Sequence, residues 1–277
     1  MDELIFVKLG GSLLTDKTRP EGLRAEVLAR LAAEVASALR QRPDLRLVLG
    51  HGSGSFGHMV ASRYRTRDGV RTREEWRGYA ETAHSAAALN YLVIEALWEA
   101  GVPALRVQPS ASAHCRDGAL LALDERPIAA GLAHGLVPVV HGDVALDDVR
   151  GGTIISTEQI LAWLAPRLNP QRVVLVGEVS GVFTADPTRD PAARLIPEIR
   201  PEMLPELTRI LGGSRGVDVT GGMVTKVQEM LALLETTPAL RQVQIISGLV
   251  PGLMQAVMVD PALEAGTRLL PAGPRPQ

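Results

Sequence analysis

The chain has 277 residues, 46% of them hydrophobic, and a net charge of −2, which gives no general attraction to nucleic acid or to an anionic membrane. No run of about 18 uninterrupted apolar residues occurs, so we expect no membrane-spanning helix. The single cysteine, Cys115, excludes an intramolecular disulfide framework and fits a reducing cytoplasm. Residues 1–4 lead directly into a strand-like stretch and lack a basic region, so we expect no signal peptide.

Along the chain, hydrophobic periodicity predicts strands and helices in alternation. The predicted strands cover residues 4–9, 45–49, 102–107, 136–141, 172–176 and 242–246. The predicted helices cover residues 24–40, 74–100, 158–168 and 223–235. This alternation predicts an α/β fold with a mainly parallel sheet that helices cover on both faces. We expect one domain over residues 1–277, with an N-terminal lobe to about residue 170 and a C-terminal lobe from about residue 171.

A glycine-rich segment follows each of the first two predicted strands. The first is Lys8-Leu9-Gly10-Gly11-Ser12, and the second runs from His51 to His58. Backbone N–H groups in such segments form cradles for anions, and a helix N-terminus strengthens them. Each segment is therefore a candidate phosphate loop.

The second segment matches two better-known patterns only in part. Gly52, Gly54 and Gly57 have the spacing of a dinucleotide-binding turn, but the acidic residues about 20 positions further on lie at a predicted helix start. Gly52 and Gly57 also have the spacing of a Walker A loop, in which His58 replaces the lysine. We expect a phosphate loop of another kind and keep dinucleotide binding as an alternative.

A third segment, residues 218–226, contains Gly221 and Gly222 at the start of a predicted helix, with Lys226 one turn inside it. Of the 29 lysines and arginines only three are lysines, and Lys8, Lys17 and Lys226 all lie near these glycine-rich segments. A lysine retained in a chain that otherwise uses arginine suggests a site that needs a compact ammonium on a flexible stem, which a planar guanidinium cannot mimic. Together the loops and lysines predict phosphoryl transfer, which needs positioning and charge stabilisation more than covalent chemistry.

The sequence resembles the amino acid kinase superfamily in four motifs that occur in the family's order. They are KLGGSLLTDK (Lys8–Lys17), HGSGSFGH (His51–His58), PVVHGDV (Pro138–Val144) and DVTGGMVTK (Asp218–Lys226). The histidine that closes the second motif makes the chain most similar to the isopentenyl phosphate kinases. The resemblance extends to about Gly252 and implies an open αβα sandwich, with ATP over the C-terminal half and the acceptor over the N-terminal half.

The resemblance also implies roles for individual residues. Lys8 would contact the transferred phosphate, Lys17 would stabilise the transition state, and Mg²⁺ would bridge the β- and γ-oxygens of ATP; we assign no residue as a metal ligand. The expected ATP-binding residues are Lys8, Gly10, Gly11, Ser12, Ser53, Glu178, Gly222 and Lys226. The expected acceptor-binding residues are Gly52, Gly57, His58 and Thr157, and the expected catalytic residues are Lys8, Lys17, His58 and Glu158.

Three of these positions depart from the family pattern. Ser156-Thr157-Glu158 stands where the family typically has Ser-Gly-Asp, so Glu158 would orient the lysines with a longer arm and Thr157 would bring a hydroxyl near the acceptor. Glu178 stands where the family has an aspartate near the adenosine. We expect the reaction class to survive these changes.

The leading hypothesis is ATP-dependent phosphorylation of isopentenyl phosphate to isopentenyl diphosphate in the cytoplasm, by a homodimer that needs neither nucleic acid nor membrane. Tyr79, Ala80, Ala83, Ala87 and Tyr91 of the long predicted helix would offer a wall to the five-carbon tail. The alternatives are a fosfomycin-type phosphonate kinase or another small-molecule kinase, a nucleotide-binding protein without turnover, and a dinucleotide-dependent oxidoreductase.

Overall fold

A computed structural model describes residues 2–16, 18–19, 21–187, 189–212 and 221–273. Its strands are β1 (Glu3–Leu9), β2 (Thr15–Asp16), β3 (Gly22–Leu23), β4 (Leu45–His51), β5 (Ala104–Arg106), β6 (His114–Arg116), β7 (Ala119–Ala122), β8 (Val137–His141), β9 (Asp143–Asp147), β10 (Gly151–Ile155), β11 (Arg172–Gly177), β12 (Glu198–Ile199), β13 (Gln242–Ser247) and β14 (Thr267–Leu269). Its α-helices are α1 (Gly11–Leu14), α2 (Ala25–Gln41), α3 (Gly54–Tyr64), α4 (Arg73–Glu99), α5 (Arg126–Ala133), α6 (Thr157–Leu168), α7 (Leu204–Gly212), α8 (Gly221–Thr236) and α9 (Leu253–Val259). Short 3₁₀ helices are η1 (Thr66–Asp68), η2 (Pro109–Ala111) and η3 (Pro201–Met203).

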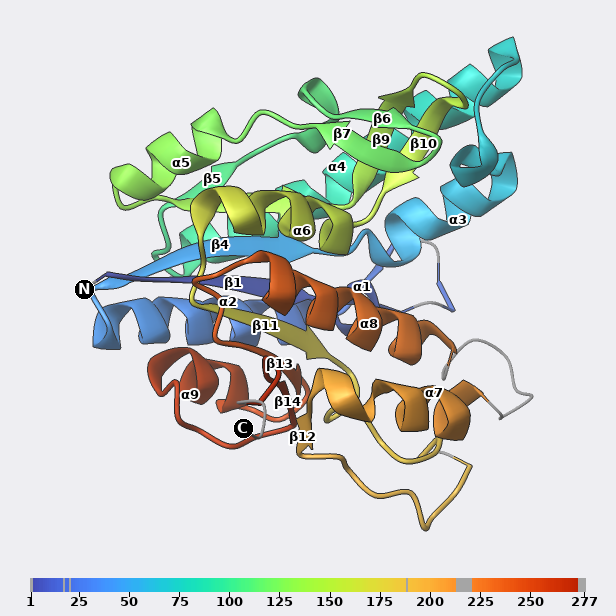
Figure 1. Ribbon diagram of the computed structural model, residues 1–277. Coiled ribbons are helices and arrows are strands. Elements are labelled where there is room, and N and C mark those ends of the chain that lie inside the picture. Colours follow the sequence, from blue (N-terminus) through green and yellow to red (C-terminus); the bar gives the residue numbers. More distant parts are fainter. Residues whose placement is uncertain (1, 17, 20, 188, 213–220, 274–277) are drawn as a thin grey trace.

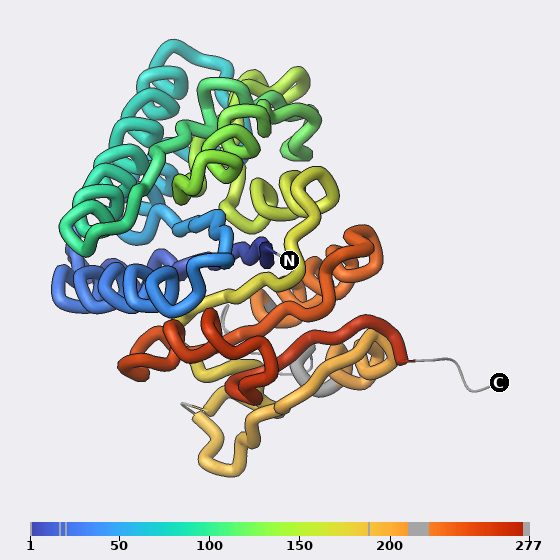
Figure 2. Tube along the Cα trace, turned by 90° about the vertical axis from the view of Figure 1, so that its left-hand side faces the viewer, coloured from blue at the N-terminus to red at the C-terminus, as the bar shows by residue number. Residues whose placement is uncertain are grey.

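Within the described chain, the main sheet has the strand order β12-β14-β13-β11-β1-β4-β8-β5. The strands from β13 to β5 pair in parallel, and β14 pairs antiparallel with β13. Because the strands are parallel, helices must connect them and both faces become covered. Figure 1 shows helices that flank the strands of this sheet. In the view of Figure 2, α2 and α4 lie on one side of the molecule and α6 and α8 on the other. The predicted fold class is confirmed.

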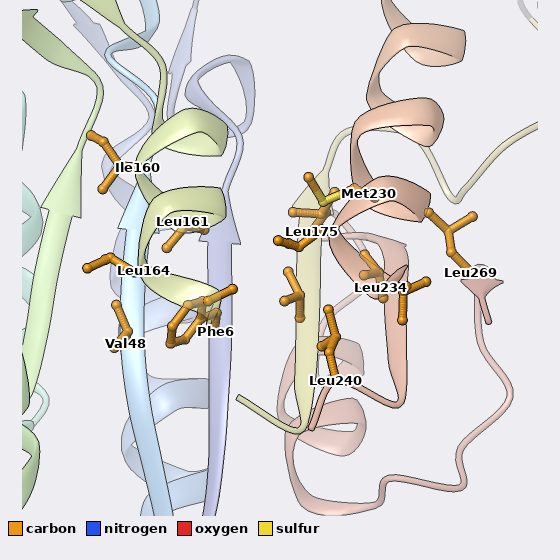
Figure 3. Close-up of a cluster of buried hydrophobic side chains, with 14 of the residues drawn as sticks. Phe6, Val48, Ile160, Leu161, Leu164, Leu175, Met230, Leu234, Leu240 and Leu269 are labelled. Carbon is orange, nitrogen blue, oxygen red and sulfur yellow. The ribbon is translucent and has the colours of Figure 1, made fainter. Parts of the chain in front are cut away.

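Alternation along β1 divides the core between these two faces. Leu4 and Phe6 belong to the cluster under α6 and α8, whereas Ile5, Val7 and Leu9 belong to the cluster under α2, α4 and α9. In Figure 3, Phe6 lies beside side chains of α6, among them Leu161 and Leu164. Successive side chains of a strand point to opposite faces. The same alternation puts Lys8 on the face of Phe6, toward α6.

The strands and helices predicted from periodicity are all present, with ends that differ by a few residues. A smaller sheet in the order β10-β9-β6-β7 was not predicted, because its strands have three to five residues and little alternation. The helix α3 was also missed, since its first turn lies inside the second glycine-rich segment. The division into two lobes stays a prediction; β1 pairs with β4 on one edge and with β11 on the other. None of the helices in the described ranges has the length and apolar run that a membrane crossing needs.

A buried ion pair ties the first strand to the C-terminal half at the end opposite the glycine loops. The guanidinium of Arg172, whose side chain is 3% exposed, lies 2.6 Å from the Glu3 carboxylate. It also donates to the backbone carbonyls of Val257 and Met258. The arginine is therefore fully desolvated, and Glu3 is the acid that balances its charge.

We predict that Glu3→Ala destabilises the protein by about 3 kcal/mol, because it leaves a buried guanidinium without its counter-charge. Urea unfolding followed by circular dichroism measures this loss. The matched control is Asp44→Ala, which removes an exposed partner of Arg42 at the same end of the sheet and should change the midpoint much less. Equal midpoints for the two variants would contradict the prediction.

Candidate active site

A cleft of about 410 Å³ lies where the carboxyl ends of β1, β4 and β11 meet the N-termini of α6 and α8. Ligands of open α/β sheets bind at such strand ends. Most of the site residues predicted from the sequence line this cleft: Lys8, Gly10, Gly11, Ser12, Gly52, Ser53, His58, Thr157, Glu158, Glu178 and Lys226. Gly57 lines the neighbouring cleft, Gly222 is exposed and lines neither, and Lys17 lies outside the described residues.

The two N-terminal glycine segments pack backbone against backbone. A Cβ atom on Gly11 would lie 2.5 Å from the Gly54 nitrogen, and one on Gly52 would lie 2.9 Å from the Gly11 nitrogen. Any side chain at these positions would force the loops apart. The glycines therefore hold the two candidate phosphate loops in direct contact, so that the groups they bind meet at one point.

Lys8 is held by an ion pair with Glu158 in the first turn of α6. The Lys8 Nζ and a Glu158 carboxylate oxygen are 2.9 Å apart, and the two side chains are 11% and 18% exposed. Burial raises the pKa of Glu158, but the ammonium of Lys8 and, more weakly, that of Lys226 outweigh it, so the pKa lies below its usual value. The pair is thus complete above the ordinary carboxylate pKa and is lost only as the pH falls through the lowered one.

Thr157 lines the cleft, but its hydroxyl already has a protein partner. It donates a 2.6 Å hydrogen bond to the backbone carbonyl of His51 and is buried. The expectation that this hydroxyl lies near the acceptor stays a prediction. Thr157 is also the first residue of α6, whose N-terminus is closed by a capping box between Ser156 and Gln159. The backbone N–H groups of a first helical turn have no partner within the helix. Such a helix start attracts anions.

A second cleft, of about 310 Å³, continues from the first. The residues that line both are Ser53, His58, Arg67, Gly142 and Ile154. His58 lies in α3, which makes the second glycine-rich segment the start of a helix and not an isolated loop. His58 therefore stands at the joint of the two clefts.

The wall of the second cleft differs from the one expected along the long helix. The residues of α4 that line this cleft are Thr82 and Ala86, and Ala61 of α3 lines it as well. Tyr91 is 55% exposed and Ala80 is exposed, so they belong to the outer surface. The packing of α3 against α4 decides which stripe of α4 faces the cleft, and sequence periodicity cannot show that.

Two buried histidines support the loops from below. The rings of His51 and His141 stack with centroids 5.6 Å apart, and the Asn90 side-chain nitrogen lies 2.9 Å from a His51 ring nitrogen. Burial and the neighbouring His141 lower the pKa of His51 to about 3, so this histidine is neutral at physiological pH. Neither histidine lines the first or the second cleft.

Sequence reasoning also missed one cation. Arg67, in η1, lines both clefts, but nothing in the sequence separated it from the many other arginines.

The acidic residues considered for dinucleotide binding lie at the start of α4. The Glu75 carboxylate accepts hydrogen bonds from the backbone of Arg71 and Thr72 and caps this helix. No ribose ligand is supplied from that position.

The comparison with known proteins decides the family. A model of the amino acid kinase family matches residues 3–247. The chain belongs to the amino acid kinase family. This membership makes it a kinase with ATP as its phosphoryl donor, and it removes the oxidoreductase alternative.

Relatives within the family are similar over nearly the whole chain. Isopentenyl phosphate kinase of Methanothermobacter thermautotrophicus is 37% identical, with 96% of this chain and 98% of the relative covered. The enzyme of the same name from Haloferax volcanii is 40% identical over 83% of this chain and 88% of its own. A crystal structure of isopentenyl phosphate kinase superposes with a TM-score of 0.81 at 34% identity, covering 96% of this chain and 100% of that chain.

For this kinase we predict that Glu158→Gln lowers kcat by about 10- to 100-fold, because the carboxylate that balances and orients the Lys8 ammonium becomes a neutral amide. The dissociation constant for ATP should change little, since Glu158 orients a lysine and does not carry the nucleotide. Parallel measurements of turnover and nucleotide binding test this.

The matched control is Glu235→Gln, which removes an exposed carboxylate near the C-terminal end of α8 that does not line the cleft and should keep normal turnover. If Glu158→Gln weakens ATP binding as much as turnover, Glu158 belongs to the nucleotide site or to folding.

Proposed function

We propose that the protein transfers the γ-phosphoryl group of ATP to isopentenyl phosphate, which yields isopentenyl diphosphate and ADP. The observation that carries the proposal is His58 at the joint of two clefts, one able to take a nucleotide and one a small acceptor. The similar enzymes named isopentenyl phosphate kinase support the same acceptor.

ATP would lie in the first cleft. Gly10, Gly11 and Ser12 follow β1 there, and Ser53, Glu178 and Lys226 line the same cleft. Glu178 is paired with Arg24 at 2.8 Å, which positions its carboxylate at the cleft edge. We keep Gly222 in the nucleotide set as a residue of the helix start before Lys226.

The acceptor would lie with its phosphate at the joint and its tail in the second cleft. Gly52, Gly57, His58 and the first turn of α6 at Thr157 would bind the phosphate. Ala61, Ala86 and Ile154 offer apolar contact for a five-carbon tail.

The chemistry needs no general base. A phosphate monoester has a second pKa near 6, so its attacking oxygen is largely anionic at neutral pH. That oxygen forms a bond to the γ-phosphorus, while the bond from this phosphorus to the β–γ bridging oxygen breaks and ADP leaves. The difficulty is to bring two anions together, and Lys8, Lys226 and Lys17 would offset their repulsion.

Mg²⁺ would enter with ATP. Among the described residues no group of three or more histidine, cysteine or acidic side chains gathers as a metal site. In kinases Mg²⁺ is usually held by substrate phosphates, water and one or two carboxylates. When bound, it would neutralise charge on the β- and γ-phosphates.

An assay of ADP release over a panel of acceptors tests the function. The panel holds isopentenyl phosphate, fosfomycin and several unrelated monophosphates, each with ATP and Mg²⁺. We expect the highest kcat/KM with isopentenyl phosphate. A higher value with fosfomycin would replace the proposal with a phosphonate kinase, and no turnover with any acceptor would leave a nucleotide-binding protein.

We predict that His58→Ala lowers kcat/KM for isopentenyl phosphate by about 10- to 100-fold, the effect of one lost charge-assisted hydrogen bond. The KM for ATP should stay nearly constant. His58→Gln keeps a donor and should retain more activity than His58→Ala. An effect on ATP alone would reverse the assignment of the two clefts.

We also propose that the active form is a cytoplasmic homodimer. Tyr91 and Trp98, 55% and 58% exposed, lie two turns apart on α4 and form an aromatic stripe that a second copy could cover. Sedimentation of the wild type should give a dimer, and Tyr91→Glu with Trp98→Glu should shift it to monomer. A monomeric wild type would contradict the proposal.

A further inference from the structure

Arg67 shares the position of His58 at the joint of the two clefts, although it comes from a different element. It is the middle residue of η1, which connects α3 to α4, and it lines the first and the second cleft. Lys8 and Lys226 line only the first. Arg67 is therefore a permanently charged side chain at the place where the two bound phosphates would meet.

The backbone of Arg67 is fixed to the smaller sheet. Its carbonyl accepts a hydrogen bond of 3.1 Å from the Arg150 guanidinium and one of 3.3 Å from the Thr153 hydroxyl. Val70 donates its backbone N–H to the Arg150 carbonyl at 2.7 Å, which ties down the other end of η1. The side chain takes no part in these contacts, so a substitution at Arg67 should leave the loop in place.

The acidic groups around Arg67 are engaged elsewhere. Asp68 pairs with Arg65 at 2.9 Å. Asp143 accepts hydrogen bonds from the Gln108 side chain and from the backbone of Ser110 and Val144. Among the described residues no ion pair or side-chain hydrogen bond engages the Arg67 guanidinium. Its charge is thus available to a ligand, whereas the charge of Lys8 is balanced by Glu158.

We propose that Arg67 is a further acceptor-binding residue, which holds the phosphate of the acceptor together with His58. This inference rests on the proposed function of the site. A guanidinium presents two parallel N–H donors that match phosphate oxygens, so it fixes orientation as well as charge. A phosphate monoester carries a charge of about −1.5 to −2 at neutral pH, which His58 alone does not balance.

The test compares Arg67→Ala, Arg67→Lys and a matched control. The control is Arg63→Ala in α3, which removes the same charge from a residue that pairs with Glu81 and lines neither cleft. For Arg67→Ala we expect the KM and the dissociation constant for isopentenyl phosphate to rise about 10- to 100-fold, with kcat less affected. Arg67→Lys should recover part of the loss, and Arg63→Ala should behave as wild type.

Calorimetric binding of isopentenyl phosphate without ATP gives a readout separate from turnover, and unfolding midpoints confirm that the variants are folded. The affinity of the wild type should fall more steeply with salt than that of Arg67→Ala, because an exposed charge is screened. Unchanged acceptor affinity in folded Arg67→Ala would overturn the inference, and so would a loss confined to ATP.

The two proposals fail in different ways. A wild type that phosphorylates another monophosphate and not isopentenyl phosphate overturns the proposed function. Arg67 is then tested by binding of that monophosphate, and a 10- to 100-fold weaker affinity in Arg67→Ala would still support the inference. An active wild type with an indifferent Arg67→Ala variant removes the inference alone.

Discussion

The structure depends on the position of β1, which hydrogen-bonds on both edges and is buried on both faces. It joins β4 of the N-terminal half to β11 of the C-terminal half, and its alternating side chains enter both hydrophobic clusters. A shift of the strand along its axis would disturb both clusters. The register of β1, and with it the position of its C-terminal residues, is therefore fixed. Lys8 and the glycines that follow are thereby held where the two halves meet.

Charge balance explains the arrangement around Lys8. An unpaired ammonium that is only 11% exposed would lose much of its solvation, and Glu158 compensates for it at 2.9 Å. The longer arm of glutamate, compared with the family's aspartate, still reaches the lysine from the first turn of α6. Thr157 fits because its hydroxyl bonds to the His51 carbonyl and leaves the helix start exposed to the cleft. The two departures from the family pattern thus keep the charges and the backbone donors of the site.

The joint between the clefts is a product of close backbone approach. Gly11, Gly52 and Gly54 let the loops after β1 and β4 touch, and α3 then carries His58 to the point of contact. From the other side, η1 brings Arg67 to the same place, held by Arg150 and Thr153. A histidine of α3 and a cation of η1 therefore line the space in which an acceptor phosphate would react.

The sequence by itself determined the alternation of strands and helices, the glycine loops and the place of Lys8 beside them, because periodicity and loop chemistry are local properties. It also located half of the residues that line the first cleft, since many of them follow strand ends that meet in any parallel sheet. Only the tertiary structure decided that the Thr157 hydroxyl bonds to His51, that Thr82 and Ala86 line the second cleft while Tyr91 faces outward, and that Arg67 joins His58. Those outcomes depend on how helices pack and on which partner each side chain finds, and such long-range contacts leave no periodic trace in the sequence.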